Sequence, residues 1–407
     1  MANGPLHDIR ILDLSRVLAG PWASQLLADY GADVIKVERP QRGDETRYWG
    51  PPWVRDTQGN ATEESAYFQS ANRNKRSITI DLSHTRGQQV VRDLCANSDV
   101  LLENFKVGDL QRYGLDFDSL RDANPRLIYC SISAYGQQGS RSKMPGYDAM
   151  IQASAGLMSI TGPRDEEGGG PQKVGVAVSD IMAGMYAVTA ILAALHERSR
   201  TGVGQSIDIP LYDSQVAWLA NQNMNYLFSG DSPRREGTAH PNLVPYQLFE
   251  ARDGHLMIAV GSDRQFRACV ECLQLPGLAN DPRFQTNAAR VEHRKALVEL
   301  MTEALGEKSV ECWLDEFSRN NVPSGPINSI ETVLTDEYAG EREFVRQLPH
   351  KLAGKVPTIA NPVRFSNSEN TYRCAPPLLG EHTESILADE LSYSGDKIEA
   401  LKKCGAI

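Results

Sequence analysis

Asp180 is the residue of this sequence best placed to do chemistry. It stands between VGVAVS and IMAGMYAVTAILAAL, so a lone carboxylate is predicted to open a nearly continuous apolar helix. One interpretation is an N-cap, because the first backbone N–H groups of a helix and its dipole stabilise an anion. The other is a nucleophile in a dry pocket, with Gly184 allowing a ligand to approach closely. Asp148, at another predicted helix start and next to Tyr147, is the competing carboxylate.

Basic residues near the predicted strands form a second group of candidates. Arg39 ends the second strand, residues 72–76 (NRNKR) precede the third, and Lys106 and Arg112 follow the fourth. These junctions are predicted to gather cations near one edge of a sheet, which suits a polyphosphate ligand. The charge pattern alone leaves a solvated rim of cations as the alternative.

Other catalytic or binding motifs are weak in this sequence. The turn at 15–21 and Glu38 match part of a dinucleotide-binding arrangement, but G-x-G-x-x-G is missing, which argues against nicotinamide or flavin. Cys269 and Cys272 form a lone C-x-x-C in an amphipathic segment, for which packing is the simplest interpretation. The sequence has no H-E-x-x-H and no G-x-S-x-G, so no metal site and no serine hydrolase is predicted.

Length and composition set the broad class of the protein. The chain has 407 residues, a net charge of −10 and 41 % apolar residues, values typical of a soluble folded protein with more than one structural unit. The acidic balance argues against a surface for nucleic acid or anionic membrane. Seven scattered cysteines and an N-terminus without a leader pattern predict a cytoplasmic protein. Val174–Leu195 resembles a membrane span, but Asp180 and two glycines favour a buried core helix.

Alternating strand and helix patterns predict an α/β fold. Strands are expected at 10–15, 32–39, 77–82, 99–105 and 126–136, with helices after Pro21 and over 87–97 and 181–199 and a further segment at 113–124. Amphipathic helices are expected at 265–273 and 289–305, and an antiparallel strand pair near the C-terminus. We predict a large Rossmann-like parallel-sheet domain and a smaller α+β domain. The predicted parts are residues 1–200 of the large domain, a linker and long helix at 201–230, and the small domain at 231–326. Residues 327–407 are expected to form a return linker and the C-terminal part of the large domain.

Eight motifs in order resemble the class III CoA-transferase family, which includes formyl-CoA transferase, carnitine CoA-transferase and α-methylacyl-CoA racemase. They are ILDLSRVLAGPWASQLLADYGADVIKVERPQRGDETRYWGPP, NRNKRSITIDL, ENFKVGDLQRYGL, ISAYGQQG, PGYDAMIQASAGLMSITG, VAVSDIMAGMYAVTAILAAL, VPSGPI and PPLLGEHT. Within the family, the chain is most similar to the succinyl-CoA:glutarate (dicarboxylate) CoA-transferases, through RGDETRYWGPPW, NRNKRSI, GYDAM, GLMSITGP and GTAHPNLVPYQLF.

The resemblance implies that Asp180 is the nucleophile, through the motif VAVSD-x-x-x-G. Its carboxylate would attack a donor thioester to give a mixed anhydride and CoA thiolate. The thiolate would then form an aspartyl-CoA thioester, and the acceptor acid would run the sequence in reverse. The implied CoA contacts are Val17, Leu18, Arg39, Ile80, Asp81, Leu82, Ser83, Asn104, Phe105, Lys106, Arg112, Met144, Pro145, Gly146 and Tyr147.

The resemblance also implies the substrates and the assembly. The expected reaction moves CoA from an acyl-CoA such as succinyl-CoA to a dicarboxylate such as glutarate, without a metal or prosthetic group, in an interlocked ring-like homodimer. A cation near Asp180 would be needed for the distal carboxylate of the acceptor. Arg47 and His240 are the candidates, together with Arg234 and Arg235.

Two other functions stay open at this point. One is an acyl-CoA epimerase like α-methylacyl-CoA racemase, although Tyr147 stands where racemases use a histidine base and tyrosine is a poor base near neutral pH. The other is a catalytically silent CoA-binding protein. Leu18 replaces a glutamine of formyl-CoA transferase and GTAHPNLVPY replaces its glycine-rich loop, so oxalate and formate are not expected as substrates.

Overall fold

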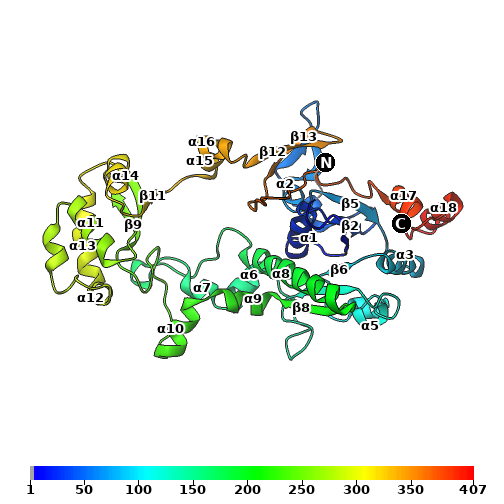
Figure 1. The fold of residues 1–407 in the computed structure, drawn as a ribbon, viewed down its shortest axis with the longest axis horizontal. Coiled ribbons are helices and arrows are strands. Elements are labelled where there is room, and N and C mark those ends of the chain that lie inside the picture. The colour runs from blue at the N-terminus through cyan, green and yellow to red at the C-terminus, as the bar shows by residue number, and fades with distance from the viewer. Residues whose placement is uncertain (1–3) are drawn as a thin grey trace. The chain divides into compact units, whose positions relative to one another are not determined.

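The computed structural model describes residues 4–407, which form two compact units (Figure 1). The first unit consists of the chain up to Leu157, Val174–Phe228 and Gly340–Ile407, and the second consists of Met158–Lys173 and Ser229–Ala339. The chain therefore leaves the first unit twice and returns to it twice. The boundaries at 200, 230 and 326 stay predictions.

A six-stranded parallel sheet forms the centre of the first unit, in the order β5-β2-β1-β6-β7-β8. Counted along the chain within this sheet, the order is 3-2-1-4-5-6, which is that of a Rossmann sheet. The strands are β1 (Arg10–Asp13), β2 (Asp33–Glu38), β5 (Lys75–Thr79), β6 (Val100–Glu103), β7 (Ile128–Ser133) and β8 (Ser206–Pro210). The predicted α/β class with a parallel sheet is confirmed.

Helices cover both faces of the sheet, because successive strand residues point to opposite sides. Ile11 and Leu102 face a core shared with α1 (Ala19–Asp29), α6 (Asp148–Ser154), α8 (Val178–Thr201) and α9 (Leu211–Trp218). Leu12 and Leu101 face a second core with α3 (Thr85–Ala96), η4 (Ile386–Glu390) and α18 (Gly395–Lys403). Segments from both ends of the chain thus enclose one sheet.

The long apolar helix expected near 181–199 is α8, which ends at Gly202 in a left-handed conformation. Within residues 4–407 it is the one helix long and apolar enough to cross a membrane by length and composition. Ala183, Ala187 and Ile191 repeat every four residues and are fully buried in the core of the first unit. This stripe is that of a helix packed on a protein core, so the predicted core helix is confirmed for one of its faces.

Shorter elements complete the first unit. They are η1 (Glu45–Tyr48), the hairpin β3 (Trp53–Arg55) and β4 (Ala61–Ser65), α2 (Ala66–Gln69), α4 (Asp109–Arg112), α5 (Phe117–Leu120), α10 (Asn221–Ser229), the hairpin β12 (Val345–His350) and β13 (Gly354–Ile359), and α17 (Thr383–Ser385). The antiparallel pair expected near the C-terminus is β12–β13. The segment between the predicted strands, 113–124, contains the single helical turn α5, and the hairpin β3–β4 was not predicted.

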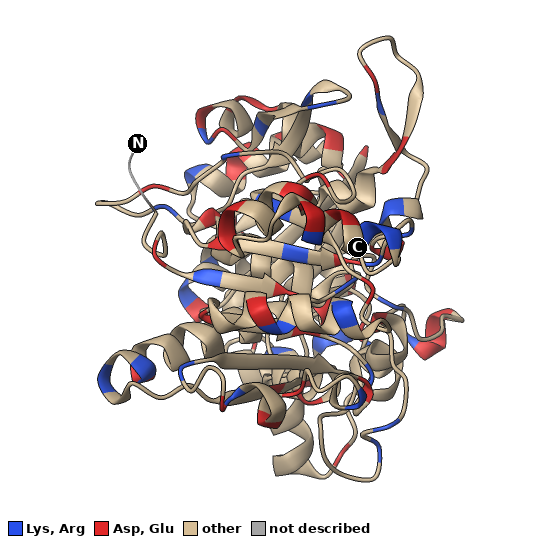
Figure 2. Ribbon diagram, turned by 90° about the vertical axis from the view of Figure 1, so that its right-hand side faces the viewer, with Lys and Arg blue, Asp and Glu red and all other residues tan. Residues whose placement is uncertain are grey.

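The second unit is built on the antiparallel sheet β11-β10-β9. Its elements are α7 (Leu157–Ile160), η2 (Asp165–Glu167), β9 (Tyr246–Ala251), β10 (Gly254–Ala259), α11 (Asp263–Cys272), η3 (Pro276–Asn280), α12 (Asn287–Glu292), α13 (Arg294–Leu305), α14 (Val310–Arg319), β11 (Ser324–Pro326), α15 (Ile330–Thr335) and α16 (Glu337–Glu341). The helix expected over 289–305 is divided at His293. Acidic and basic residues alternate along the ribbon of the chain (Figure 2).

Candidate active site

Asp180 lies in the first turn of α8, but it is not the residue that caps the helix. The N-cap position is Ala177, three residues earlier, so the capping interpretation of Asp180 is wrong. Among residues 4–407, no hydrogen-bond donor contacts the Asp180 carboxylate; only its backbone N–H is engaged, with Asp148. The side chain is therefore available for another partner.

Asp148, at the start of α6, supplies the missing cap. Its carboxylate accepts hydrogen bonds from the backbone N–H of Ser179 at 2.8 Å and from that of Asp180 at 3.4 Å. The side-chain amide of Gln152 donates a third hydrogen bond at 2.7 Å. A carboxylate from a neighbouring helix thus satisfies the first amides of α8. Of the two competing carboxylates, that of Asp148 accepts hydrogen bonds that hold the start of α8. The carboxylate of Asp180 accepts none from the residues that the structure describes.

The electrostatics of the site make Asp180 unusual. Burial, and secondarily repulsion from Asp148, raise the pKa of the Asp180 carboxyl to about 7. Both causes disfavour the ionised form. A perturbed carboxylate without a hydrogen-bond partner is a typical feature of a functional site, and its ionised form is a better nucleophile than a solvated carboxylate.

Tyr67 belongs to this site, although no motif in the sequence pointed to it. Burial and the nearby charges of Asp180 and Asp148 raise the pKa of Tyr67 to about 12, so the hydroxyl stays protonated. Its ring packs edge-on against Trp49, with 5.1 Å between ring centroids. Tyr67 lies in α2, which Ser65 caps, and a Ser before a short apolar run was the one local signal for that turn. A protonated hydroxyl beside two carboxylates can donate a hydrogen bond to a substrate oxygen.

The turn between β1 and α1 lies at the switch point of the sheet. β1 is flanked by β2 and β6, where the strand order reverses, and ligands of such sheets bind outside the carboxyl ends of the strands at this point. Val17 in this turn has a φ of +69°, a left-handed conformation that is rare for a β-branched residue. Asn104, just after β6, donates to the carbonyl of Arg16 at 2.7 Å and accepts from its N–H at 2.9 Å.

The same turn approaches Asp180 through α1. Gly184 is one helical turn after Asp180, so both residues lie on one face of α8. A Cβ at Gly184 would stand 2.7 Å from the carbonyl oxygen of Ala19 and 3.3 Å from Cδ1 of Trp22. Gly184 therefore permits the close approach of α1, rather than that of a ligand as expected. The Val17 turn and Asp180 are brought to one region of the first unit.

The predicted cations are only partly at this edge of the sheet. Arg39 follows β2 and Lys106 follows β6, and both side chains are exposed at the carboxyl ends of their strands. Arg112 is exposed and pairs with Asp109 in α4. Phe105 is half-buried beside the guanidinium of Arg16, which lies 5.1 Å from the ring centroid.

Residues 72–76 do not join these cations, so that part of the prediction was wrong. β5 begins at Lys75, which places the run at the amino end of the strand, opposite the candidate site. Arg73 is buried in an ion pair with Asp29, and Lys75 is buried 3.2 Å from Asp13. These cations neutralise internal carboxylates.

The remaining predicted CoA contacts lie on two surface segments. Ile80 is buried after β5, and Asp81 accepts hydrogen bonds from the N–H and hydroxyl of Ser83 at 2.9 and 2.7 Å, with Leu82 half-buried between them. Met144, Pro145 and Tyr147 are exposed before α6, and Gly146 is half-buried. Leu18, by contrast, is buried at the start of α1. All of these positions stay predictions for CoA binding.

Arg47 is not available to a substrate. Its guanidinium donates to both oxygens of Glu38 at 2.8 Å, to Glu64 at 2.9 and 3.0 Å, and to the carbonyl of Pro377 at 3.0 Å. It also lies 3.7 Å from the ring centroid of Phe68 and is 3 % exposed. With every donor engaged, Arg47 has none left for a substrate carboxylate, so its predicted binding role is not supported.

The other predicted carboxylate ligands belong to the second unit. His240 packs against Tyr246, and burial, aided by Arg294, lowers the pKa of its imidazole. Arg235 pairs with Asp165 and donates to the carbonyl of Pro163, while Arg234 is exposed. A role of His240 toward the substrate stays a prediction.

Cys269 and Cys272 are buried in the core of the second unit and are free thiols. Burial raises the pKa of both, which suits packing rather than reactivity. No group of three or more His, Cys, Asp or Glu side chains within residues 4–407 is arranged to hold a metal ion.

Comparison with known proteins identifies the family. The model of CoA-transferase family III matches residues 6–383. The chain is 46 % identical over 385 residues to a succinate–glutarate CoA-transferase of Agrobacterium fabrum, covering 95 % of each chain. It is 41 % identical over 403 residues to the human succinyl-CoA:glutarate CoA-transferase, covering 99 % of this chain and 90 % of the human protein.

Solved structures agree with this relationship. A CAIB/BAIF family protein from Brucella suis superposes with a TM-score of 0.83 at 45 % sequence identity, covering 95 % of this chain and 99 % of that protein. The parallel sheet, the motifs resembling class III CoA-transferases and the family match all agree. The chain belongs to CoA-transferase family III and is a CoA-transferase.

Proposed function

We propose that this enzyme transfers CoA from succinyl-CoA to a dicarboxylate such as glutarate, with Asp180 as the nucleophile. The observation that carries the proposal is the state of Asp180, whose carboxylate has no hydrogen-bond donor among residues 4–407 and a pKa raised to about 7. Asp180 lies on the face of α8 that meets the start of α1. This helix follows β1, the strand at which the strand order of the sheet reverses. The choice of substrates is supported by the names of the relatives from Agrobacterium fabrum, mouse and human.

The proposed reaction has four exchanges. A carboxylate oxygen of Asp180 attacks the thioester carbonyl of the donor, the C–S bond breaks, and CoA leaves as thiolate from a mixed anhydride. The thiolate attacks the Asp180 carbonyl of that anhydride, which releases the donor acid and leaves an aspartyl-CoA thioester. The acceptor carboxylate then attacks this thioester and expels the thiolate, which finally takes the acyl group of the acceptor and restores the Asp180 carboxylate.

The surrounding residues have proposed roles in this reaction. Val17, Leu18 and residues 104–106 hold CoA at the switch point, with Arg39 and Lys106 near its phosphates. Tyr67 donates a hydrogen bond to the acyl oxygen as negative charge develops on it. His240 remains the candidate for the distal carboxylate, and alanine in its place should raise the KM for glutarate if it does so.

Trapping of the intermediate tests the function directly. The enzyme is incubated with succinyl-CoA, treated with hydroxylamine or borohydride, and digested for mass spectrometry. We expect modification of Asp180 and formation of glutaryl-CoA when glutarate is added. Exchange of the α-proton of a branched acyl-CoA without CoA transfer would instead indicate an epimerase, and binding of CoA with no exchange would indicate a silent binding protein.

The rate of transfer should depend on pH through Asp180. The ionised carboxylate is the nucleophile, so kcat/KM is expected to rise with pH below about 7 and to level off above it. Asp148→Asn keeps an oxygen that can cap α8 but removes the repelling charge. The midpoint should therefore move to lower pH in this variant. A midpoint that moves to higher pH would contradict the placement of these two groups.

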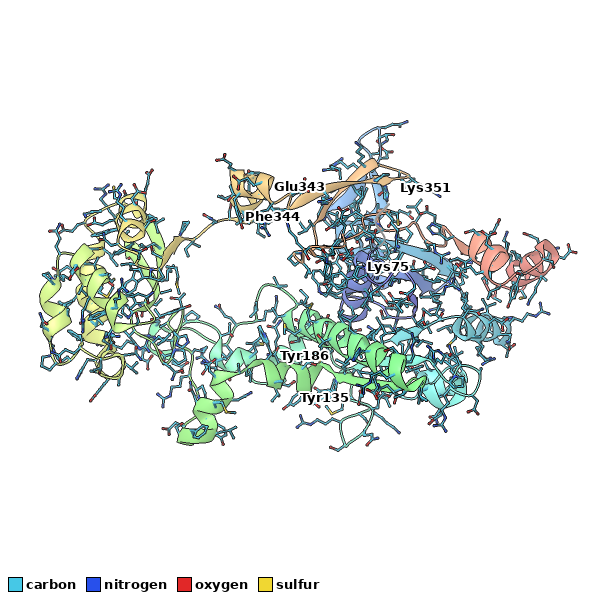
Figure 3. The ribbon with its side chains drawn as sticks, in the orientation of Figure 1. Lys75, Tyr135, Tyr186, Glu343, Phe344 and Lys351 are labelled. Atoms are coloured by element: carbon cyan, nitrogen blue, oxygen red, sulfur yellow. The ribbon has the colours of Figure 1, made fainter. Side chains whose placement is uncertain are left out.

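We also propose a homodimer and a cytoplasmic location. Large apolar side chains are exposed along α8–α10, including Tyr186 (Figure 3), Trp218, Leu227 and Phe228, the last at 89 %. Large exposed apolar side chains of this kind favour association. Sedimentation at micromolar concentration should give a mass of two chains, and a single-chain mass would refute the dimer.

A further inference from the structure

Four ionisable side chains from β1, β2, β5 and the loop after β2 are completely buried. They are Asp13, Lys36, Asp44 and Lys75, each no more than 1 % exposed; Lys75 is labelled in Figure 3. Lys36 and Asp44 form an ion pair of 2.9 Å, and Lys75 pairs with Asp13 at 3.2 Å. Buried ion pairs are weak evidence for stability, because desolvation offsets much of their attraction. The contacts of the Lys36–Asp44 pair indicate a role other than stability.

The pair touches the backbone of the turn at two points. Lys36 Nζ donates to the carbonyl of Ser15 at 2.9 Å, and both carboxylate oxygens of Asp44 accept from the N–H of Val17 at 3.2 Å. Asp44 is itself fixed, since it accepts from the N–H and hydroxyl of Thr46 at 3.0 and 2.8 Å. Glu38 accepts from the backbone N–H of Asp44 at 3.0 Å. The turn is therefore held by groups that cannot move independently.

These hydrogen bonds fix the backbone conformation of Val17. Its φ of +69° is unfavourable for a β-branched side chain, and such a conformation persists only where the surroundings impose it. Asp44 holds the N–H of Val17, and Asn104 holds the peptide groups of Arg16 on the other side. Without Asp44, Val17 is free to return to negative φ. The next amides, at the start of α1, would then change direction.

We propose that Asp44, paired with Lys36, is a positioning residue for acyl-CoA. It keeps Val17 in the left-handed conformation, so that the first amides of α1, from Leu18 onward, face the switch point beside Asp180. Leu18 is the N-cap residue of α1, and its apolar side chain accepts no hydrogen bond from the first amides of the helix. A ligand can accept hydrogen bonds from these amides instead. The inference rests on the proposed binding of acyl-CoA at this turn, and it assigns the buried pair to substrate binding rather than to folding.

A conformational rescue tests the proposal. Glycine adopts positive φ without penalty, so Val17→Gly should make the turn less dependent on Asp44. We expect Asp44→Ala to lower kcat/KM by about 100-fold, mainly through a higher KM for acyl-CoA. In the Val17→Gly background the loss caused by Asp44→Ala should be roughly tenfold smaller. The KM for the acceptor acid should change little in either background.

Two further variants keep the test decisive. Lys36→Met combined with Asp44→Ala removes both charges and avoids an unpaired buried lysine, so it serves if Asp44→Ala alone fails to fold. Arg73→Ala breaks an equally buried ion pair, with Asp29, that does not touch the turn. Its effect on kcat/KM should be the same in the wild-type and the Val17→Gly backgrounds. Equal losses from Asp44→Ala in the two backgrounds, as for Arg73→Ala, would overturn the proposal.

Measurements of CoA binding distinguish a failure of the positioning role from a failure of the proposed function. Wild type, Asp44→Ala, Val17→Gly and the double variant are also compared by their dissociation constants for CoA alone, measured by calorimetry, which requires no turnover. Wild-type enzyme that binds CoA but does not transfer it from succinyl-CoA to glutarate would refute the proposed function and leave the positioning test valid. Unchanged CoA affinity in Asp44→Ala would refute the positioning role even in an active enzyme.

Discussion

Replacing Asp180 with alanine is expected to abolish CoA transfer while the protein stays folded. Loss of a nucleophile typically lowers kcat by about 10⁴-fold or more, because the covalent route disappears. Affinity for CoA, measured by calorimetry, should remain, since the Val17 turn and residues 104–106 are untouched. The trapped adduct with hydroxylamine should disappear with the activity.

The pH dependence of the stability of Asp180→Ala provides a control, because its direction follows from the pKa of Asp180. The pKa of Asp180 is raised from 3.8 to about 7 in the folded protein, so the folded state holds the proton more tightly than the unfolded chain. Stability is then lost as the pH rises between these two values. The melting temperature of Asp180→Ala relative to wild type should therefore be higher at pH 8 than at pH 4. A variant that retains full transfer activity would remove Asp180 from the mechanism.

Replacing Arg47 with alanine is expected to produce the largest loss of stability. Glu38 and Glu64 would stay buried without their common partner, and removal of one member of such a group typically costs about 3–5 kcal/mol. The Phe68 ring would also lose the guanidinium that lies 3.7 Å from its centroid. Denaturant unfolding followed by circular dichroism measures this change.

The stability of Arg47→Lys and its KM for glutarate show whether Arg47 acts on folding or on substrate binding. Arg47→Lys keeps one charge but cannot reach both carboxylates with a planar fork, so an intermediate stability is expected. At a temperature where Arg47→Lys is folded, its KM for glutarate should equal that of wild type. A KM that rises without loss of stability would restore Arg47 as a ligand of the substrate and refute its structural assignment.

The fold of the first unit could be predicted because its signals are local. The strands around Ile11, Val34 and Leu101 are short apolar runs between helix starts and stops, and alternation of strands and helices implies a parallel sheet. The hairpin β3–β4 was missed since Pro51 and Pro52 and the charged residues of β4 give no alternating apolar pattern. The long helix ending at Gly202 was found, but its first residues were not, because Ala177 carries no capping side chain.

The sequence could name candidate residues of the site, but it could not decide between their alternative roles. Asp180 stands out as a carboxylate in an apolar helix, and the structure leaves its side chain without a hydrogen-bond partner among residues 4–407. Arg47 and the run at 72–76 were misjudged because a cation near a strand can face either solvent or an internal carboxylate. The sequence does not show which until the strands are paired. Tyr67 depends on the same long-range packing and carries no distinctive pattern of its own.

The return of the C-terminal segment to the first unit has a consequence for synthesis. Ile386, Leu387, Ile398 and Leu401 cover a face of the sheet whose first strand is made of residues 10–13. A nascent chain emerging from the ribosome must therefore keep that apolar face uncovered until residues 386–401 have been synthesised. Truncated products that end at residue 387 should aggregate and depend on chaperones, because they lack Ile398 and Leu401 although every residue of the candidate active site is present.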